Sequence, residues 1–109
     1  MAQLRTLVDD FVAERRWEEF HDPKNLSCSI AIEAAELMEH FQWLRSDQLD
    51  SVREDHRAME QIREELADIL AYMLSFASRM RVDLSSALES KMQKNAVKYP
   101  AEEFRGRFR

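Results

Sequence analysis

The sequence has only one glycine and two prolines among its 109 residues. Hairpins and tight turns depend on residues such as glycine and proline that supply special backbone angles, so a chain with so few of them is a poor candidate for a β-sheet. Leucine, alanine, glutamate, arginine and methionine, which all favour helices, are abundant instead. The composition therefore predicts an all-α fold.

Cysteine and long apolar runs are also scarce. The single cysteine, Cys28, cannot form a disulfide within the chain, which is typical of proteins in a reducing compartment. The first residues, MAQLRTLVDDF, contain acids where a signal peptide has its apolar run. The longest apolar run, LADILAYMLSFA, is shorter than the roughly 20 residues that cross a membrane. We therefore expect a cytoplasmic protein with no membrane partner.

Basic residues are fewer than acidic ones, 16 against 21, and the net charge is −5. A protein that binds the phosphate backbone of nucleic acids needs a basic stripe, so we expect no nucleic-acid partner. The only basic cluster is the tail FRGRFR, where Arg105, Arg107 and Arg109 alternate with other residues. A solvated or partner-contacting tail is the simplest interpretation of that segment.

Four helical segments are predicted within a single domain, residues 1–109. The first covers residues 2–19 and ends before HDPKN, where Pro23 disfavours helix. The second covers residues 26–43, with Asn25 or Ser27 as its cap, and SVRE at residues 51–54 has capping-box spacing for a third helix that reaches residue 80 or 81. Asp83 would cap a fourth helix to residue 97. We expect a compact, antiparallel four-helix bundle that oligomerises through helix packing.

Two pairs of acids lie at helical spacing beside apolar positions. Glu33 and Glu36 fall on one shoulder of the apolar arc of the second helix, and Glu65 and Asp68 fall on the corresponding shoulder of the third. In most helices a Glu-x-x-Glu pair simply faces the solvent. These pairs, however, have no lysine or arginine one turn away on their own helix to neutralise them.

If the two shoulders face each other, two carboxylates at ~5 Å repel by roughly 3 kcal/mol at an effective dielectric near 20. Bound protons could relieve that repulsion, and so could bound cations. A set of ligands made only of carboxylate oxygens suits Mg²⁺, with Mn²⁺ as a possible substitute, and both ions also accept phosphate oxygens. A di-iron bundle would need Glu-x-x-His pairs, and His40 lies four residues after Glu36 instead of three. The pattern favours a magnesium-dependent phosphate site.

The same residues resemble a known family. EAAE followed by EELAD is similar to the Glu-x-x-Glu and Glu-x-x-Asp motif of the MazG-like all-α nucleoside triphosphate pyrophosphohydrolases. In order along the chain, ERRWEEFHDPKN, FQWL, ILAYML, VDL, KMQKNAVKYP and the closing RGR resemble the dCTP pyrophosphatase branch, so that the resemblance extends from about residue 4 to residue 107.

The resemblance implies hydrolysis of nucleoside triphosphates to monophosphate and pyrophosphate, which clears unwanted nucleotides from the pool. It implies that the Mg²⁺ ligands and catalytic residues are Glu33, Glu36, Glu65 and Asp68. By matching position it assigns the base and sugar pocket to Trp17, His21, Trp43 and Tyr72. It assigns the phosphate side of the substrate to Lys91, Asn95, Lys98 and Tyr99.

One position departs from the family pattern. Some members have a base-contacting histidine on the first helix where this sequence has Val8. A strict preference for cytosine is therefore not implied, and the expected substrates are dCTP or modified pyrimidine deoxynucleotides. Taken alone, Trp17 and Trp43 could equally be core or interface residues.

Helices this amphipathic in so short a chain leave apolar surface uncovered, which predicts a homodimer or a homotetramer of paired dimers. Two alternatives to the enzyme remain. A non-catalytic helical interaction module would explain the amphipathic helices but not the matching acid pairs. A nucleotide sensor would bind the same substrate with the same groups and not hydrolyse it.

Overall fold

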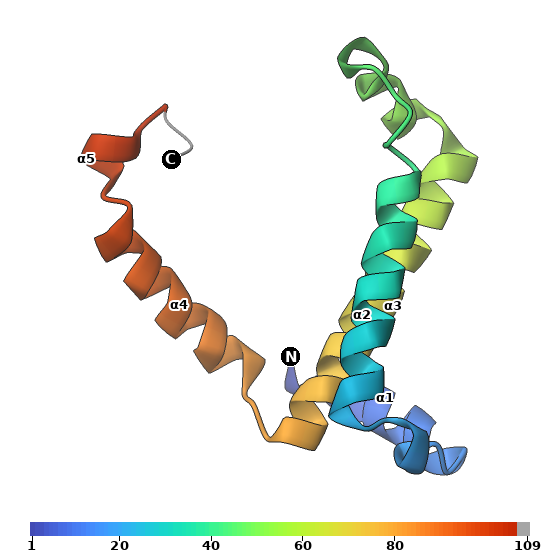
Figure 1. Cartoon of the computed structure of the whole chain (residues 1–109). Coiled ribbons are helices and arrows are strands. Elements are labelled where there is room, and N and C mark those ends of the chain that lie inside the picture. The colour runs from blue at the N-terminus through green and yellow to red at the C-terminus, as the bar shows by residue number, and fades with distance from the viewer. Residues whose placement is uncertain (107–109) are drawn as a thin grey trace.

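The chain folds into five α-helices and three short 3-10 helices in a computed structural model that describes residues 1–106 (Figure 1). In chain order they are α1 (Ala2–Glu14), η1 (Glu18–Phe20), α2 (Pro23–Glu39), η2 (Ser46–Gln48), η3 (Asp50–Glu54), α3 (His56–Met80), α4 (Leu84–Lys98) and α5 (Ala101–Phe104). No strand occurs in this part of the chain, so the all-α prediction is confirmed. Arg107 and Arg109 of the basic tail lie outside the described residues.

Helices α1, α2 and α3 form one unit, which we call the body. The most extensive contact is between α2 and α3, which run side by side, and α1 packs against α3 (Figure 1). The buried apolar side chains of the described residues all belong to these helices: Val12, Leu26, Ile62, Leu74 and Ala77. Ser78 of α3 ties α1 in place, because its Oγ accepts a hydrogen bond from Arg5 Nε at 2.9 Å and donates one to Asp9 Oδ1 at 2.8 Å.

Helix α1 ends at Glu14, five residues before the predicted end. Arg16 adopts a left-handed φ of 53°, and the N–H groups of Arg16 and Trp17 donate to the carbonyls of Ala13 and Val12 at 3.1 Å each. This is a Schellman-type ending, in which the left-handed position is usually glycine. The apolar pattern of the sequence continues past this point, so periodicity alone could not locate the end. The turn leaves Trp17 outside the helix.

Helix α2 begins earlier than predicted. Asp22 is its cap, because Asp22 Oδ1 accepts a hydrogen bond from the N–H of Asn25 at 2.7 Å, and Pro23 occupies the first helical position. The prediction that Asn25 or Ser27 caps this helix was therefore wrong. Proline is tolerated at the first position, because the N–H that it lacks would have no partner there. The helix ends at Glu39, so Trp43 lies in the turns that follow it.

The segment between α2 and α3 also differs from the prediction. SVRE does not start a long helix; residues 50–54 form η3 instead, and α3 begins at His56. Asp55 caps α3 by accepting from the N–H groups of Arg57 and Ala58 at 3.1 Å each. The predicted end of α3 at residue 80 and the cap of α4 by Asp83 are both confirmed, since Ser86 N–H donates to Asp83 Oδ1 at 3.2 Å.

Helices α4 and α5 form an arm that points away from the body (Figure 1). Helix α4 has no extensive contact with α1, α2 or α3, and Leu88, Met92 and Val97 on it are 63%, 56% and 82% exposed. The radius of gyration is 17.3 Å, against about 13 Å for a compact domain of this length. The expectation of a compact bundle is therefore not met within one chain, since the apolar face of the arm has no partner in it. No helix in residues 1–106 combines the length and apolarity of a membrane span.

Candidate active site

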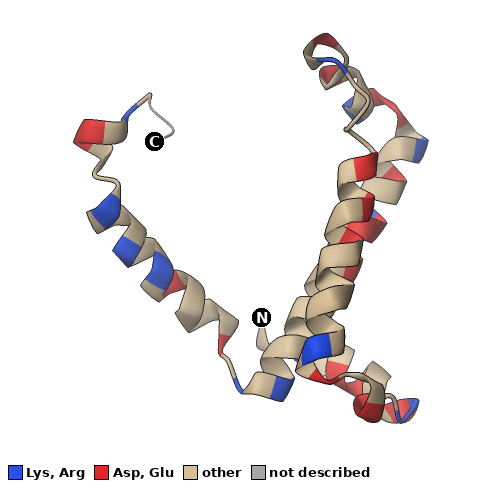
Figure 2. Ribbon diagram, viewed as in Figure 1, with Lys and Arg blue, Asp and Glu red and all other residues tan. Residues whose placement is uncertain are grey.

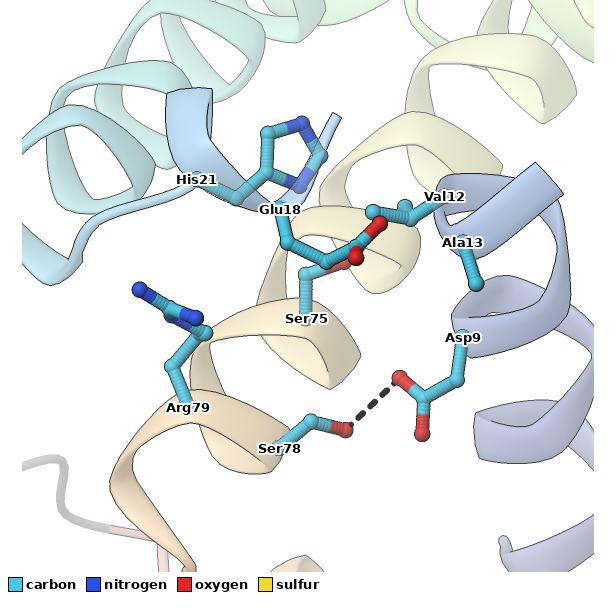
Figure 3. A pocket seen from close by; sticks show the side chains of 8 residues that line it. All are labelled: Asp9, Val12, Ala13, Glu18, His21, Ser75, Ser78 and Arg79. Atoms are coloured by element: carbon cyan, nitrogen blue, oxygen red, sulfur yellow. Dashed lines mark hydrogen bonds between the residues drawn. The ribbon is translucent and has the colours of Figure 1, made fainter. Parts of the chain in front are cut away.

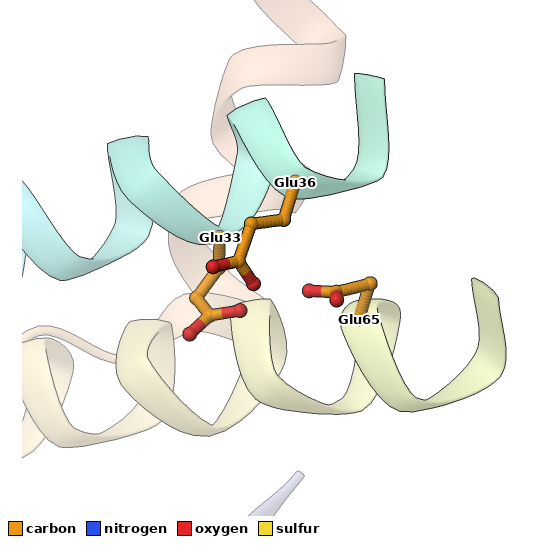
Figure 4. Close-up of side chains that lie close together, drawn as sticks. All are labelled: Glu33, Glu36 and Glu65. Atoms are coloured by element: carbon orange, nitrogen blue, oxygen red, sulfur yellow. The ribbon is translucent and has the colours of Figure 1, made fainter. Parts of the chain in front are cut away.

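The two predicted acid pairs lie at the contact between α2 and α3. Glu33 and Glu36 extend from α2 and Glu65 from α3, and their carboxylates converge (Figure 4). One carboxylate oxygen from each of the three residues lies within 4.8 Å of the others. We call these three residues the acidic cluster. The sequence argument that the shoulders of the two helices face each other is supported by this geometry.

The acidic cluster has no positive partner in the described part of the chain. The ion pairs found there join Arg5 to Asp9 and three further pairs of exposed surface residues, and none involves the cluster. Glu33 Oε2 and Glu65 Oε2 are buried and have no hydrogen-bond partner. Buried carboxylate oxygens without partners are costly, so the arrangement is suited to a bound cation or a bound proton.

The unfavourable environment of the cluster also raises the pKa of Glu33. Burial, the close approach of the Glu65 and Glu36 carboxyl groups, and the negative charges of Glu36 and Asp68 together raise the pKa of the Glu33 carboxyl from 4.5 to about 7. The pKa of Tyr72 is raised as well, first by burial and then by the charges of Glu33, Asp68 and Glu36. Burial is the largest cause of both shifts, and the neighbouring carboxylates, which have no positive partner in the described residues, add to it.

Asp68 lies outside the closest group of oxygens but next to it. It is exposed, it follows Glu65 by about one turn of α3, and its charge acts on both Glu33 and Tyr72. Asp68 also lines a neighbouring cavity. It therefore connects the acidic cluster to that cavity.

This cavity, which we call the aromatic pocket, has a volume of about 160 Å³ and lies between α1, the two residues that flank η1, and α3. Three residues assigned to a base pocket by the resemblance line it: Trp17, His21 and Tyr72. The ring centroids of His21 and Tyr72 are 6.4 Å apart, and those of Trp17 and Phe11, which pack edge to face, are 5.7 Å apart. The aromatic side chains can stack on a flat ring of a ligand, and the carboxylates beside them can coordinate a cation that binds the ligand's charged group.

A hollow of about 350 Å³ opens on another side of the acidic cluster. Glu36 and Glu65 line it together with two further acids, Glu39 and Glu64. An anion such as a triphosphate would be repelled from a surface with this many carboxylates unless cations neutralised them. The hollow strengthens the case for a cation site.

The remaining predicted residues lie away from this site in the chain. Trp43 is 85% exposed in the turns after α2. The other four are on or at the end of the arm and make local contacts; for example, Lys98 Nζ lies 5.2 Å from the centroid of the Tyr99 ring. The roles assigned to Trp43, Lys91, Asn95, Lys98 and Tyr99 stay predictions, and within one chain this geometry does not bring them to the acidic cluster.

Sequence reasoning missed part of the lining of the aromatic pocket. Phe11, Val12, Ala71 and Ser75 line it in addition to the predicted residues. Ser75 had a detectable signal, because it follows Tyr72 by three residues and Asp68 by seven and so continues the same face of the helix. Periodicity identifies the apolar face of α1, but which of its residues line the pocket depends on how α1 packs against α3.

Comparisons with known proteins agree with the geometry. The model of the MazG-like family matches residues 28–107. The chain is 40% identical over 106 residues to dCTP pyrophosphatase 1 of Bos taurus and 41% identical over 101 residues to that of Homo sapiens, covering 97% and 93% of this chain. It spans only 63% and 59% of the length of those two relatives. The crystal structure of a pyrophosphatase from Archaeoglobus fulgidus superposes with a TM-score of 0.85 at 40% identity, covering 92% of both chains.

Proposed function

The chain belongs to the MazG-like family, and from this premise we propose that it hydrolyses nucleoside triphosphates to the monophosphate and pyrophosphate in a Mg²⁺-dependent reaction. The proposed substrates are dCTP or modified pyrimidine deoxynucleotides, since the relatives named above are dCTP pyrophosphatases. Removal of unwanted nucleotides from the cytoplasmic pool is the role that we propose for this activity.

The observation that carries the proposal is the position of the acidic cluster directly beside the aromatic pocket. Glu33, Glu36 and Glu65 offer oxygens within 4.8 Å of one another, and Asp68 lines the pocket next to them. A nucleotide consists of a flat base joined to a chain of phosphates. The site has aromatic side chains that can stack on the base, and next to them carboxylate oxygens that can bind the metal ion of the phosphates. A non-catalytic interaction module would not need that pairing.

The donor set fits a divalent ion of the Mg²⁺ type. Glu33 Oε2 and Glu65 Oε2 are buried oxygens without partners, and an all-carboxylate set is the one that Mg²⁺ and Mn²⁺ prefer. Glu33, Glu36, Glu65 and Asp68 would hold the ion. When bound, it would neutralise the phosphate oxygens and polarise the phosphorus that is attacked.

The side chains have defined tasks in the proposed hydrolysis. The oxygen of a water molecule bonds to the α-phosphorus, the bond from that phosphorus to the α–β bridging oxygen breaks, and pyrophosphate leaves. A carboxylate must accept the proton of the water. We propose Glu33, with Glu36 as the alternative, because Glu33 Oε2 has no hydrogen-bond partner in the protein. Trp17 and Tyr72 hold the base in a fixed orientation.

The residues proposed to bind the phosphates would reach the acidic cluster only from a second copy of the chain. Lys91, Asn95 and Lys98 are on the arm, away from the acidic cluster of the same chain. Figure 2 shows the lysines of α4 opposite the red acidic segments of α2 and α3. We propose that the arm of one copy packs on the body of another in a homodimer or a homotetramer. Exposed apolar residues on both parts support this, among them Leu66, Met73, Leu88 and Met92.

A screen of the common nucleoside triphosphates with Mg²⁺ tests the proposed function. We expect release of pyrophosphate, greatest with pyrimidine deoxynucleotides, and loss of the reaction when the metal is chelated. Orthophosphate as the only product would mean attack at the γ-phosphorus and would reject the mechanism. Metal-dependent nucleotide binding with no product of either kind would instead identify a nucleotide sensor.

A further inference from the structure

Ser75 and His21 separate two cavities in the body of the molecule. The aromatic pocket lies on one side of them. On the other side is a second cavity of about 260 Å³, whose lining includes Asp9, Glu18 and Arg79 (Figure 3). Figure 3 shows Ser75 between the η1 segment that carries His21 and Glu18 and the lower part of the cavity with Ser78 and Arg79. Ser75 and His21 are the polar residues that both cavities share.

Both residues have hydrogen-bonding capacity that the protein itself does not use. His21 Nδ1 is buried without a partner. Ser75 is only 6% exposed and is the one polar residue in the buried set of residues 1–106. A helical serine commonly bonds back to the carbonyl four residues earlier, but no such bond is among the side-chain hydrogen bonds of the described chain. A buried polar atom without a partner, such as His21 Nδ1, calls for a ligand or a functional explanation, and Ser75 lines the same pocket.

Helix α3 orders the groups that a nucleotide would meet. Asp68, Tyr72 and Ser75 lie on one face at positions i, i+4 and i+7. With a rise of 1.5 Å per residue, Ser75 is roughly 10 Å along the axis from Asp68. Asp68 is at the acidic end of the aromatic pocket and Ser75 is at the opposite end. If the phosphates lie at the acidic cluster, the edge of the base farthest from the sugar faces Ser75.

The chemistry of a pyrimidine identifies that edge. Position 4 of the ring lies opposite N1, which carries the sugar, so the group at position 4 reaches deepest into the pocket. That group is an amino donor in cytosine and an oxo acceptor in uracil and thymine. Val8 and Val12 on the α1 side of the pocket have no polar side-chain atom with which to distinguish the two. Ser75 and His21 supply polar groups at this end of the pocket.

We propose that Ser75 is a specificity-determining residue that, with His21, contacts the group at position 4 of a pyrimidine base; this rests on the proposed function. A serine hydroxyl both donates and accepts a hydrogen bond, so it satisfies an amino group and an oxo group alike. The pocket therefore selects for pyrimidines that have a polar group at position 4 and tolerates exchange of one such group for the other.

Binding of three monophosphates tests this inference without requiring turnover. They are dCMP, dUMP and the 2-pyrimidinone analogue, which has hydrogen at position 4. Affinities are measured with Mg²⁺ present for the wild type and Ser75→Ala, using the quenching of tryptophan fluorescence, because Trp17 lines the pocket. The matched control is Ser86→Ala, which removes an exposed hydroxyl in the first turn of α4 that lines neither cavity. Melting temperatures verify that each variant is folded.

We expect Ser75→Ala to weaken binding of dCMP and dUMP by about tenfold each, as for the loss of one hydrogen bond to a buried group. It should leave binding of the 2-pyrimidinone nucleotide unaffected, and Ser86→Ala should alter none of the three affinities. The inference is overturned if Ser75→Ala weakens binding of all three ligands equally or of none. It is also overturned if the wild type prefers dCMP or dUMP over the other by more than about a hundredfold, or if it binds none of the three ligands.

Hydrolysis of dCTP by the same samples is measured separately. If the monophosphates bind with the expected selectivity and no pyrophosphate forms, the proposed hydrolysis fails while the role of Ser75 stands. If pyrophosphate forms and the selectivity of binding does not depend on Ser75, the proposed hydrolysis stands and this inference is overturned.

Discussion

The body and the arm of this protein are stabilised in different ways. The body has a small apolar core that includes Leu26 and Leu74, and the hydrogen bonds of Ser78 link two of its helices. The arm has no comparable core; its contacts are local, such as the edge-to-face contact of Tyr99 with Phe104 at 5.2 Å. The metal and base parts of the proposed site belong to the body, and the phosphate part belongs to the arm. One chain therefore contains all the predicted residues but does not assemble them.

The largest effect is expected from the body. Glu36→Gln and Asp68→Asn should each reduce pyrophosphate release by at least about a thousandfold, because each removes a charged ligand of the proposed metal site. Helical content, measured by circular dichroism, should not change, since both substitutions relieve repulsion instead of creating it. Glu60→Gln is the control, because Glu60 is an exposed acid of α3 paired with Arg63 at 3.8 Å. Undiminished turnover in Glu36→Gln would remove the acidic cluster from the mechanism.

The arm should have the next largest effect. Lys91→Ala should lower kcat/KM for the triphosphate by about tenfold to a hundredfold, as expected for loss of a charged contact to phosphate. Lys24→Ala, which removes an exposed lysine of the body, should have little effect. Equal effects of the two substitutions would mean that the arm does not contact the substrate.

Mixing two variants with lowered activity shows whether the arm acts on another copy. When Glu36→Gln and Lys91→Ala chains are dissociated and reassembled together, a site shared between copies should regain up to about a quarter of wild-type activity, since random pairing in a dimer restores one site in four. Activity no higher than the sum of the separate variants would show that each arm serves its own body.

Protonation of the acidic cluster should make the stability of the body depend on pH. The pKa of Glu33 is about 7 when folded, above its ordinary value of 4.5. Between these values the folded state binds more protons than the unfolded state, so the stabilisation is complete below pH 4.5 and is lost as the pH rises through 7. Thermal melts of the metal-free protein from pH 5 to 8 should follow this slope, and Glu33→Gln should flatten it. A melting temperature that rises with pH in this window would contradict the assignment.

The smallest effect concerns the junction of the body and the arm. Asp83→Ala removes the side chain that caps α4 and should destabilise that helix by about 1 kcal/mol. Asp83→Asn retains a capping oxygen and serves as the control. Hydrogen exchange should become faster in α4 while the body remains unchanged. Faster exchange throughout α2 and α3 would mean that the arm supports the body within one chain.

The body was the more predictable of the two parts. Helical periodicity predicted that Glu33, Glu36 and Glu65 would converge, because helices of this length keep their faces in register over several turns. Local rules worked less well at helix ends. Pro23 suggested a break, although proline is acceptable at the first helical position, and Arg16 takes a left-handed conformation that glycine usually adopts.

The arm was predictable as a helix but not in its position. Its cap and length are local properties, and both were predicted closely. What it packs against depends on a surface that the periodicity of one chain cannot identify, because an apolar stripe fits a neighbouring copy as well as its own body. Ser75 is an intermediate case, since its place on the face of α3 could be read from the sequence and its burial beside two cavities could not.

A titration with Mn²⁺ followed by electron paramagnetic resonance tests the central claim most directly. The signal of free Mn²⁺ should decrease when wild-type protein is added together with dCMP, and excess Mg²⁺ should restore it. Glu36→Gln should bind little or no Mn²⁺, and Glu60→Gln should behave as the wild type. If Glu36→Gln binds as much Mn²⁺ as the wild type, the acidic cluster is not a metal site and the account is contradicted.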